Sequence, residues 1–281
     1  MVLSNNTDMF YEEINSFIKT QYHRFTEYQE LAVKTLNKVH EVCEKHNITY
    51  YLAFGSLLGA IRDGGQIPWD YDIDILVPYR YRDELLKVLD TDLSEDFHYD
   101  TRYRNRDCRH FTIKVAPKGY DCAFLHVDIF WLIGEEADPR IQEKNYRLRR
   151  YFYNCSIYKF SNKRVYSRMV RIKRKIKNFR YLIYPYMLLE RKYLKLLEKP
   201  FDKYEYCTYN GRNRNIFKSK WFGVPQKITL ANGLTFYIPE DYESILKATY
   251  GDYMRIPDID KRIDEFTYSL KNLEKYAKLE A

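Results

Sequence analysis

Hydrophobic residues in the first part of the chain follow helical spacing and then change to a strand-like run. Between Asp8 and His46 apolar side chains recur every three or four residues, at Leu31, Leu36, Val39, Val42 and Cys43. This spacing predicts a helix, which Asn47 is suited to end. Residues 48–54, ITYYLAF, are β-branched and aromatic and predict a buried strand that ends before Gly55.

Strict alternation of apolar and acidic residues marks the next strand. Residues 71–77 read YDIDILV, so one side of a strand is apolar while the other carries Asp72 and Asp74. We therefore expect a half-buried strand here. A short helix over residues 57–62 precedes it, and a helix over Arg80–Leu89 follows it.

The rest of the pattern predicts a mixed fold. Phe97–Tyr103, Arg109–Ala116 and Ala123–Ile133 have the length and composition of three further strands. Residues 204–281 contain short strands and helices. We expect an α/β (α+β) fold in which helices flank a β-sheet of mixed connectivity.

A basic segment interrupts this pattern. Glycine is absent from residues 138–199, and cations crowd together at Lys163, Arg164, Arg168, Arg171, Lys173, Arg174, Lys175, Lys177 and Arg180. The aromatic and apolar run YLIYPYMLL follows at residues 181–189. We predict three parts: a core with an N-terminal helix at 1–137, a basic helical insertion at 138–199, and a C-terminal part at 200–281 that completes the domain.

The cations of the insertion fit three interpretations. They form a solvated helix face, they bind anionic headgroups at a membrane surface beside the aromatic run, or they bind nucleic acid, although no recognised module positions it. The net charge of +8 and the pI of about 9.0 favour an anionic partner. Nucleic acid, phospholipid and a phosphorylated substrate all have that chemistry.

Composition narrows the class of protein. With 281 residues, of which 45% are hydrophobic and 31% charged, the chain is long enough to bury a core and is not expected to be disordered. No apolar stretch approaches the roughly 18–20 residues of a transmembrane helix, and the first residues do not resemble a secretory signal. The five cysteines include no CxxC pair, which disfavours disulfides and structural zinc. We expect a cytoplasmic protein, with peripheral binding to the inner face of the cell membrane as a variant.

The acidic strand is the strongest chemical signal. Asp70, Asp72 and Asp74 alternate within IPWDYDIDILVP, so on one strand the three carboxylates share a face, about 6.6–7 Å apart. Aspartate is a poor strand former and aligned like charges repel, so the triplet is costly unless a cation offsets it. Oxygen-only ligands suit Mg²⁺ or Mn²⁺. The alternative is a solvated strand face whose acids pair with Lys and Arg.

Two further elements fit phosphate chemistry. The turn at Gly55 and Ser56 opens a helix, where backbone N–H groups bind anions and glycine allows a phosphate to approach closely. Asp128 lies in the apolar run LHVDIF, and two-metal phosphoryl chemistry uses a third carboxylate. A buried, hydrogen-bonded structural aspartate is the alternative. We interpret the nearby His126 as structural.

The sequence resembles the LicD family in three separate segments. The run AFGSLLGAIRDGGQIPWDYDIDILVPYRYRDEL at residues 53–85 resembles the signature of that family. HVDIFWLIG at 126–134 and FYIPEDYESILKATYGDYMRIPDIDKR at 236–262 fit the same pattern. The family includes bacterial phosphocholine transferases and is related to fukutin and the fukutin-related protein. The resemblance implies a nucleotidyltransferase-like fold and leaves the basic segment outside.

The resemblance also implies roles for the acidic residues. Asp72 and Asp74 would carry Mg²⁺ or Mn²⁺, and Asp128 would be the third carboxylate, as ligand or base. Asp70 belongs to the motif and would orient the metal ligands without binding the metal itself. Many relatives have another acid where this chain has Tyr71, a departure that spares the Asp72 and Asp74 pair.

The implied reaction is transfer of a phospho-alcohol to a hydroxyl of a cell-surface glycan such as teichoic acid, lipopolysaccharide or a capsule precursor. Phosphocholine is the leading candidate for the transferred group. CDP-choline would then be the donor and CMP the leaving group. Gly55 and Ser56 would hold the phosphates, and Arg62 and Lys114 are phosphate clamps or ordinary surface charges. Asp252 caps the structure that follows it or reaches the site. The 29 tyrosines offer rings for a trimethylammonium cage.

Two rival functions remain open at this point. A true nucleotidyltransferase would use CTP or another nucleoside triphosphate and release pyrophosphate, and the same carboxylates would serve it. A non-catalytic protein would bind a membrane or nucleic acid through its positive face. Nucleic acid is the less favoured partner in either case.

Overall fold

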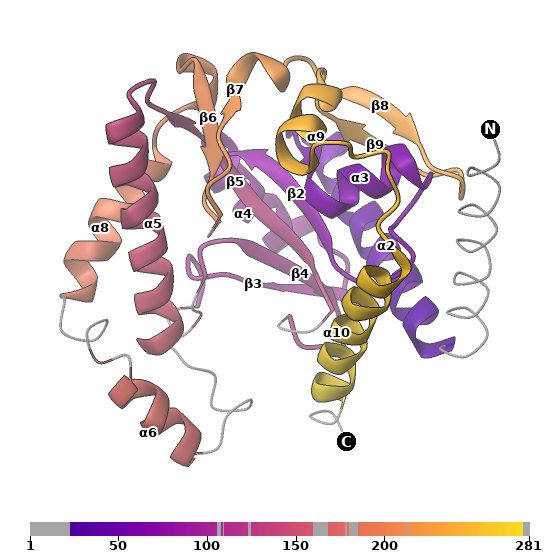
Figure 1. The fold of residues 1–281 in the computed structure, drawn as a ribbon, viewed down its shortest axis with the longest axis horizontal. Helices are drawn as coiled ribbons and strands as arrows, with labels where there is room; N and C mark the ends of the chain where they lie inside the picture. Colours follow the sequence, from indigo (N-terminus) through magenta and orange to yellow (C-terminus); the bar gives the residue numbers. More distant parts are fainter. Residues whose placement is uncertain are drawn as a thin grey trace.

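The computed structural model describes residues 23–105, 108, 110–122, 125–159, 168–177, 179, 185–211 and 213–277. Over these ranges the chain forms a seven-stranded mixed sheet and a separate two-stranded sheet, with helices packed around them (Figure 1). The strands of the large sheet are β1 (Tyr51–Leu52), β2 (Ile73–Pro78), β3 (Phe97–Asp100), β4 (Ile113–Pro117), β5 (Val127–Glu135), β6 (Tyr206–Tyr209) and β7 (Phe217–Lys218). The smaller sheet pairs β8 (Gln226–Thr229) with β9 (Thr235–Ile238).

The helices divide by their place along the chain. One group surrounds the sheet, a second belongs to the basic segment, and a third lies at the C-terminal end (Figure 1). In that order they are α2 (His23–Lys45), α3 (Phe54–Arg62) and α4 (Arg82–Asp92), then α5 (Pro139–Lys159), α6 (Arg168–Lys177) and α8 (Tyr186–Leu197), then α9 (Tyr242–Tyr250) and α10 (Ile259–Ala277). The mixed α/β fold predicted from the sequence is confirmed.

Strand β5 is the centre of the sheet. Its first part pairs with β2 in parallel and with β4 in antiparallel orientation, while its last part pairs with β6. The order β1-β2-β5-β4-β3 places the acidic strand β2 next to β5, although Asp74 and Asp128 are far apart in sequence. Pairing within the sheet, and not sequence proximity, therefore assembles the acidic residues.

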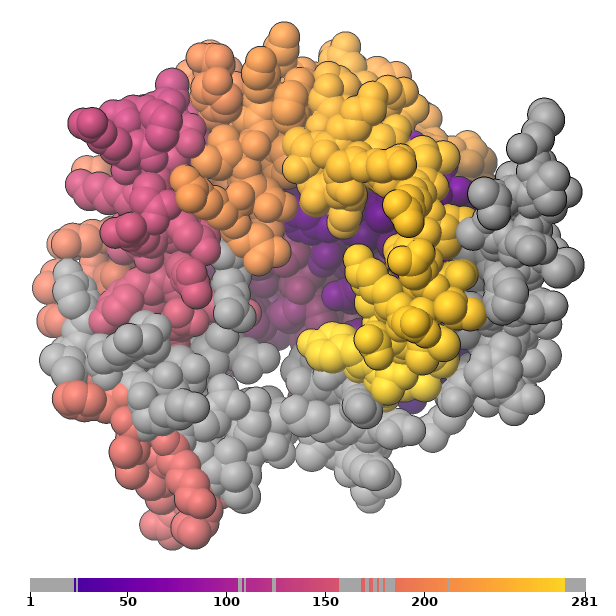
Figure 2. All heavy atoms as spheres, viewed as in Figure 1, coloured from indigo at the N-terminus to yellow at the C-terminus, as the bar shows by residue number. Residues whose placement is uncertain are grey.

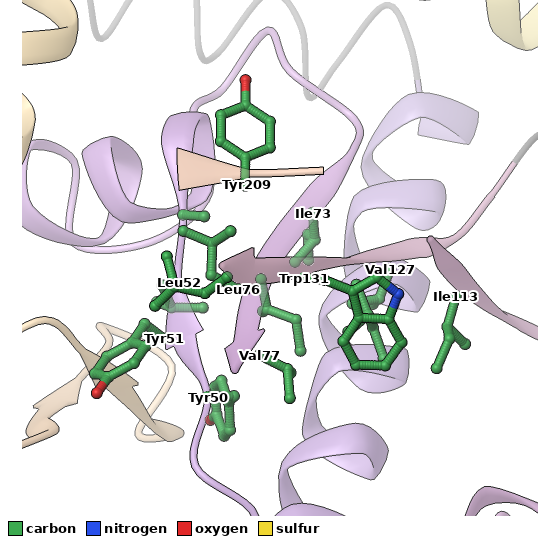
Figure 3. Close-up of a cluster of buried hydrophobic side chains, with 14 of the residues drawn as sticks. Tyr50, Tyr51, Leu52, Ile73, Leu76, Val77, Ile113, Val127, Trp131 and Tyr209 are labelled. Carbon is green, nitrogen blue, oxygen red and sulfur yellow. The ribbon is translucent and has the colours of Figure 1, made fainter. Parts of the chain in front are cut away.

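One face of the sheet is apolar and packs into the core. Helix α2 contacts β2, β4 and β5 on this face. The alternating residues Ile73, Ile75 and Val77 of β2 are buried, as the half-buried pattern predicts. Figure 3 shows Trp131 of β5 among these side chains, and its indole nitrogen donates to the carbonyl of Phe111 at 2.6 Å. This apolar face fixes the polar residues of the same strands on the opposite face.

The acidic run is not one continuous strand. Strand β2 begins at Ile73, so Asp70 and Asp72 lie in the segment before it, and the prediction of three carboxylates on one strand face is wrong. The carbonyl of Asp70 accepts from the side-chain amide of Gln29 at 2.6 Å and from that of Gln66 at 3.2 Å. Side-chain amides thus satisfy the backbone carbonyl of Asp70, and this residue does not pair with a strand of the sheet.

The preceding strand is also shorter than predicted. Pairing is limited to Tyr51 and Leu52, because helix α3 begins at Phe54. Phe54 has φ of 48°, an unusual conformation for a bulky residue, and it turns the chain sharply into the helix. Gly55 and Ser56 consequently lie in the first turn of α3. Helix α2 confirms the predicted N-terminal helix from His23 onward, and the earlier residues lie outside the described ranges.

The basic segment packs on the sheet through α5 and α8, which contact each other at the left of Figure 1. Arg149 of α5 forms an ion pair at 2.8 Å with Glu135, the last residue of β5, and both side chains are at most 2% exposed. Asn145 donates to the same carboxylate at 2.6 Å. A buried polar contact therefore fixes α5 to the centre of the sheet. The division into three parts stays a prediction.

Candidate active site

Three charged side chains lie in a row across the polar face of the sheet. The register places Asp74 of β2 opposite Asp128 of β5, and Asp128 opposite Lys114 of β4. Lys114 Nζ lies 2.5 Å from Asp128 Oδ2, and the two side chains are 13% and 15% exposed. Cross-strand neighbours have Cβ atoms about 4.5–5.5 Å apart, so the pairing alone brings two carboxylates and one ammonium together.

The N-terminus of α3 contacts the acidic residues directly. Ser56 Oγ accepts a hydrogen bond from the backbone N–H of Asp74 at 2.8 Å. A Cβ atom added to Gly55 would lie 2.9 Å from Asp70 Oδ2, so glycine is the residue that lets this carboxylate approach the helix. The positive φ of Phe54 in the same turn costs about 1–3 kcal/mol and is typical of a functional site.

The carboxylates raise one another's pKa. The pKa of Asp74 is raised well above its ordinary value, first by burial and then by the charges of Asp72, Asp128 and Asp70. The pKa of Asp70 is raised in the same way, by burial and then by Asp72. Like charges gathered in a poorly hydrated place favour the binding of a cation, which would hold these groups ionised.

Asp128 differs from the other carboxylates because Lys114 and His126 lie beside it. Burial acts to raise its pKa, but Lys114 and then His126 outweigh burial, and the pKa is held far below its ordinary value. His126 Nε2 lies 3.2 Å from Asp128 Oδ2 and 2.5 Å from Lys114 Nζ. Asp128 Oδ1 is buried and has no hydrogen-bond partner among the described residues. Asp128 is therefore ionised, and one of its oxygens has no partner within the part of the chain that the structure describes.

A cavity of about 550 Å³ opens beside this row of charges. Figure 2 shows a hollow between the C-terminal helices and the segment that contains α5, with residues of the N-terminal half at its floor. The polar lining includes Asp74, Lys114 and Asp128. The aromatic lining consists of Phe54, Phe111, Phe130, Phe152, Tyr153, Tyr193, Tyr209 and Tyr250. The cavity thus has charged side chains in one part of its wall and aromatic rings in the rest.

The aromatic residues form two groups. Phe54, Phe130 and Tyr209 contact one another with ring centroids 4.6 to 5.8 Å apart. Tyr209 is close enough to Asp74 that this charge, after burial, raises the pKa of the phenol. The second group is Phe111, Phe152 and Tyr193, in which the rings of Phe152 and Tyr193 stack at 4.1 Å. The first group is therefore the one that borders the carboxylates, and we call it the Phe54 group.

Two sequence-predicted residues lie apart from the cavity lining. Arg62 ends α3 and donates to both oxygens of Asp63, at 3.0 and 2.9 Å, with its guanidinium over the ring of Trp69. Asp252 is exposed, whereas Thr249 and Tyr250 of the same motif line the cavity. The roles of Arg62 as phosphate clamp and of Asp252 as site residue stay predictions. Gly55, Ser56, Asp70, Asp74, Lys114 and Asp128 are brought together by the contacts above.

Several residues of the site are not among those that the sequence predicts. His126, which we expect from the sequence to be structural, contacts both Lys114 and Asp128. Its signal was present, since His126 and Asp128 are two apart and share a face wherever the chain is extended. Tyr209 and the asparagines at 210, 213 and 215 also line the cavity. No motif in the sequence connects these residues with the acidic strand.

A match to a known family agrees with this fold and site. Residues 47–155 match the family described as LicD/FKTN/FKRP, nucleotidyltransferase domain. The matched residues include β2, β4 and β5, which carry Asp74, Lys114 and Asp128. Residues 47–155 therefore carry a domain similar to that of the LicD family, as the sequence resemblance indicated. The matched range extends into the segment that we expected as an insertion.

Individual relatives are similar over different lengths. The chain is 26% identical over 253 residues to the lipopolysaccharide cholinephosphotransferase LicD of Haemophilus influenzae, covering 82% of this chain and 91% of that protein. It is 50% identical over 42 residues to the human ribitol 5-phosphate transferase FKRP, which is 15% of this chain and 8% of FKRP. An uncharacterized protein of Rickettsia typhi is 44% identical over 54 residues, 19% of this chain and 18% of that protein. The two characterised relatives are phosphotransferases by name.

Proposed function

We propose that this protein transfers a phospho-alcohol from a CDP-linked donor to a hydroxyl of a cell-surface glycan, with phosphocholine as the best candidate. The observation that carries the proposal is the row of Asp74, Asp128 and Lys114 beside an aromatic-lined cavity. Carboxylates supply a place for a metal and a base, and the ammonium supplies a charge for a phosphate. The names of the relatives support phosphocholine and ribitol phosphate as groups of this class.

The acidic residues fit Mg²⁺ or Mn²⁺. Asp70 and Asp74 have raised pKa values that a cation would oppose, and Asp128 has a buried oxygen without a partner in the described part of the chain. Mg²⁺ usually takes one or two carboxylates together with substrate phosphates, so a complete protein cage is not required. We assign Asp72 and Asp74 as ligands and Asp128 as a third ligand or base. When bound, the metal would neutralise charge on the donor diphosphate.

Lys114, Asp128 and the N-terminus of α3 would each have a separate role in this reaction. Lys114 would bind a donor phosphate oxygen, since its ammonium already faces the site at Asp128. Asp128 is ionised and can accept the proton of the acceptor hydroxyl as that oxygen attacks phosphorus and CMP leaves. The N-terminus of α3 would bind phosphate through its backbone N–H groups. Ser56 fixes the distance between this helix and Asp74.

The Phe54 group supports a cationic donor. Aromatic faces attract a quaternary ammonium by about 0.5–2 kcal/mol for each good contact. Phe54, Phe130 and Tyr209 border the carboxylates, where an alcohol attached to the reacting phosphate would lie. A polyol phosphate such as ribitol phosphate would gain nothing comparable from these rings. This is why we favour phosphocholine over a CDP-linked polyol.

The decisive assay follows the leaving group. Purified protein with Mg²⁺ and a glycan acceptor is incubated with CDP-choline or with CTP, and CMP and pyrophosphate are measured. We expect CMP from CDP-choline, and loss of this activity in Asp72→Asn and Asp74→Asn. Asp202→Asn, in a surface ion pair with Arg80, is the matched control and should keep full activity. Pyrophosphate release from CTP without CMP release from CDP-choline would instead establish the rival nucleotidyltransferase.

The acceptor is proposed to be a lipid-linked glycan reached from the membrane surface. No helix among the described residues has the length and apolar character needed to cross a bilayer. Helix α6 reads RMVRIKRKIK, without an acidic residue, and Met169, Ile172 and Ile176 are exposed by 67%, 47% and 71%. Exposed apolar side chains on a basic helix suit the interface of an anionic membrane.

Vesicle flotation tests the membrane contact separately from catalysis. We expect the protein to float with vesicles that contain anionic lipid and not with neutral vesicles. Replacing Met169, Ile172 and Ile176 by Ser should abolish flotation while the assay with a water-soluble acceptor is unchanged. Binding that follows added nucleic acid instead, or no flotation at low salt, would reject the membrane contact without affecting the proposed reaction.

A further inference from the structure

A second group of metal-ligating side chains lies at the edge of the sheet. Asp100 is the last residue of β3, and Cys108 and His110 lie in the connection from β3 to β4. Asp100 is opposite Lys114 in the β3–β4 register, so it continues the row of Asp74, Asp128 and Lys114 by one strand. The group is therefore separate from the carboxylates of the active site, with Lys114 between the two.

The three side chains converge. One potential ligand atom from each of Asp100, Cys108 and His110 lies within 4.8 Å of the other two. The distance from Cys108 Sγ to His110 Nε2 is 3.3 Å. A tetrahedral zinc ion with the usual Zn–S and Zn–N lengths separates sulfur and nitrogen by about 3.5 Å. The two side chains thus already have nearly the separation that zinc requires.

The histidine is also oriented for such a role. His110 Nδ1 lies 3.3 Å from the carbonyl oxygen of Thr112. Both ring nitrogens lie near the sulfur of Cys108, Nε2 at 3.3 Å and Nδ1 at 3.5 Å, and the Thr112 hydroxyl also lies 3.3 Å from Nδ1. In the tautomer that donates from Nδ1 to the carbonyl, the lone pair is on Nε2 and is available to a metal. Metal-bound histidines generally use this arrangement, in which a backbone carbonyl fixes the tautomer and the ring orientation.

Electrostatics supports a cation here. The Cys108 side chain is buried, and its sulfur lies within 4.8 Å of a carboxylate oxygen of Asp100 and of a ring nitrogen of His110. A metal ion at this place would bind all three groups. The combination of sulfur, imidazole and carboxylate is typical of zinc and unlike the oxygen-only set of Mg²⁺.

We propose that Asp100, Cys108 and His110 bind a zinc ion, with water in the fourth position. The ion would tie the end of β3 to the connection that supplies His110, Phe111 and Thr112 to the cavity wall. The proposal is independent of which phospho-alcohol the enzyme transfers. It assigns the chain two kinds of metal, each with its own ligands.

Metal analysis of tag-free protein tests this directly. The protein is expressed with added zinc, dialysed, and measured for metal content by mass spectrometry, and a second sample is loaded with Co²⁺. We expect one zinc per chain that excess Mg²⁺ does not displace, and a thiolate-to-cobalt charge-transfer band in the loaded sample. Cys108→Ser should remove the band, and Asp100→Asn and His110→Gln should each weaken zinc binding at least tenfold.

Two controls separate this site from its surroundings. Cys122 is also buried, and its sulfur lies 3.3 Å from the carbonyl oxygen of Lys114, so Cys122→Ser removes a neighbouring thiol that is not a proposed ligand. It should keep zinc and the cobalt band. Asp74→Asn removes the proposed magnesium ligand and should also keep zinc. Zinc binding that is absent in the unaltered protein, or equal in Asp100→Asn, would overturn the proposal even if transferase activity is found.

Discussion

At the scale of single residues, the two carboxylates of adjacent strands are held in opposite states. Asp128 has a pKa below its ordinary value because Lys114 and His126 outweigh its burial. Asp74, directly opposite, has a raised pKa because burial and neighbouring acids act together. Such a separation of two nearby carboxyl groups keeps Asp128 ionised, as an electrostatic role or metal binding requires, and makes the charge of Asp74 depend on a bound cation.

The raised pKa of Asp74 predicts a gain in stability when its charge is removed. A carboxyl with a raised folded-state pKa stabilises the fold at pH values below its ordinary value of 3.8, and this contribution is lost as pH rises through the folded-state pKa. In EDTA at pH 7, Asp74→Asn should therefore melt higher, by about 2–4 °C for each kcal/mol gained. The difference should shrink near pH 3.

The same variant gives a second measurement. Mg²⁺ should raise the melting temperature of the unaltered protein and leave that of Asp74→Asn unchanged, and turnover should be lost. Asp202→Asn should keep both the Mg²⁺-dependent rise in melting temperature and full turnover, because Asp202 forms a surface pair with Arg80. A lower melting temperature for Asp74→Asn in EDTA would show that Asp74 has a structural role that we have not assigned.

Phe130 tests the preference for a cationic donor. Phe130→Leu keeps an apolar side chain but removes a ring of the Phe54 group. We expect kcat/KM for CDP-choline to fall about 5- to 30-fold, which corresponds to a cation–π contact of about 1–2 kcal/mol. Activity with CDP-ribitol should change less than twofold. Phe152→Leu alters the other aromatic group and is the control, and an equal loss in both variants with both donors would refute the cage.

At the scale of elements, α3 combines a strained start with tight packing. Phe54 enters the helix at φ of 48°, and Gly55 and Gly59 follow within it. A Cβ atom on Gly59 would lie 2.5 Å from the carbonyl oxygen of Gly65, whereas one on Gly55 would meet the mobile end of the Asp70 side chain at 2.9 Å. The backbone neighbour cannot move aside, but the carboxylate can.

This difference separates stability from activity among three glycine variants. Gly59→Ala should lower the free energy of unfolding by about 1–3 kcal/mol, because it overpacks α3 against a backbone carbonyl. Gly55→Ala should change stability less and reduce turnover at least tenfold, since it displaces Asp70 and crowds the phosphate position. Gly65→Ala has no atom within 4 Å of the new methyl group and is the control. Denaturant unfolding and the CMP assay measure the two effects.

The elements also show what the sequence could predict. The alternation in YDIDILV predicted a half-buried strand, and β2 has buried Ile73, Ile75 and Val77. The sequence could not show that Asp70 and Asp72 lie outside the strand, because the side chain of the distant Gln29 binds the carbonyl of Asp70, and that of the nearby Gln66 binds the carbonyl of Asp72. Periodicity describes one element at a time, whereas these contacts depend on tertiary packing.

At the scale of the whole molecule, strand β5 joins the site to the basic helices. Asp128 lies near its start and Glu135 at its end, where Glu135 binds Arg149 and Asn145 of α5. Helices α5 and α8 supply Phe152 and Tyr193 to the cavity wall. The pairing of Asp74 with Asp128 could not be read from local patterns, because it depends on the order of strands.

The buried pair of Glu135 and Arg149 predicts a large asymmetry between single and double variants. Glu135→Gln leaves an uncompensated buried guanidinium and should lower stability by about 3–5 kcal/mol. Combining Glu135→Leu with Arg149→Met removes both charges and should cost less than the single change. Urea unfolding measures both values. A double variant that is less stable than Glu135→Gln would show that the ion pair itself stabilises the attachment of α5.

The cavity is built from segments that the ribosome produces at very different times. All four acidic residues and Lys114 have been synthesised by residue 128, but β6 carries Tyr209 and α9 ends at Tyr250. Strand β6 pairs with the end of β5, so the open edge of β5 stays exposed in a shorter nascent chain. A nascent chain that stops before β6 would therefore hold the acidic groups without Tyr209 and Tyr250, so the wall of the cavity is complete only after residue 250 has been synthesised.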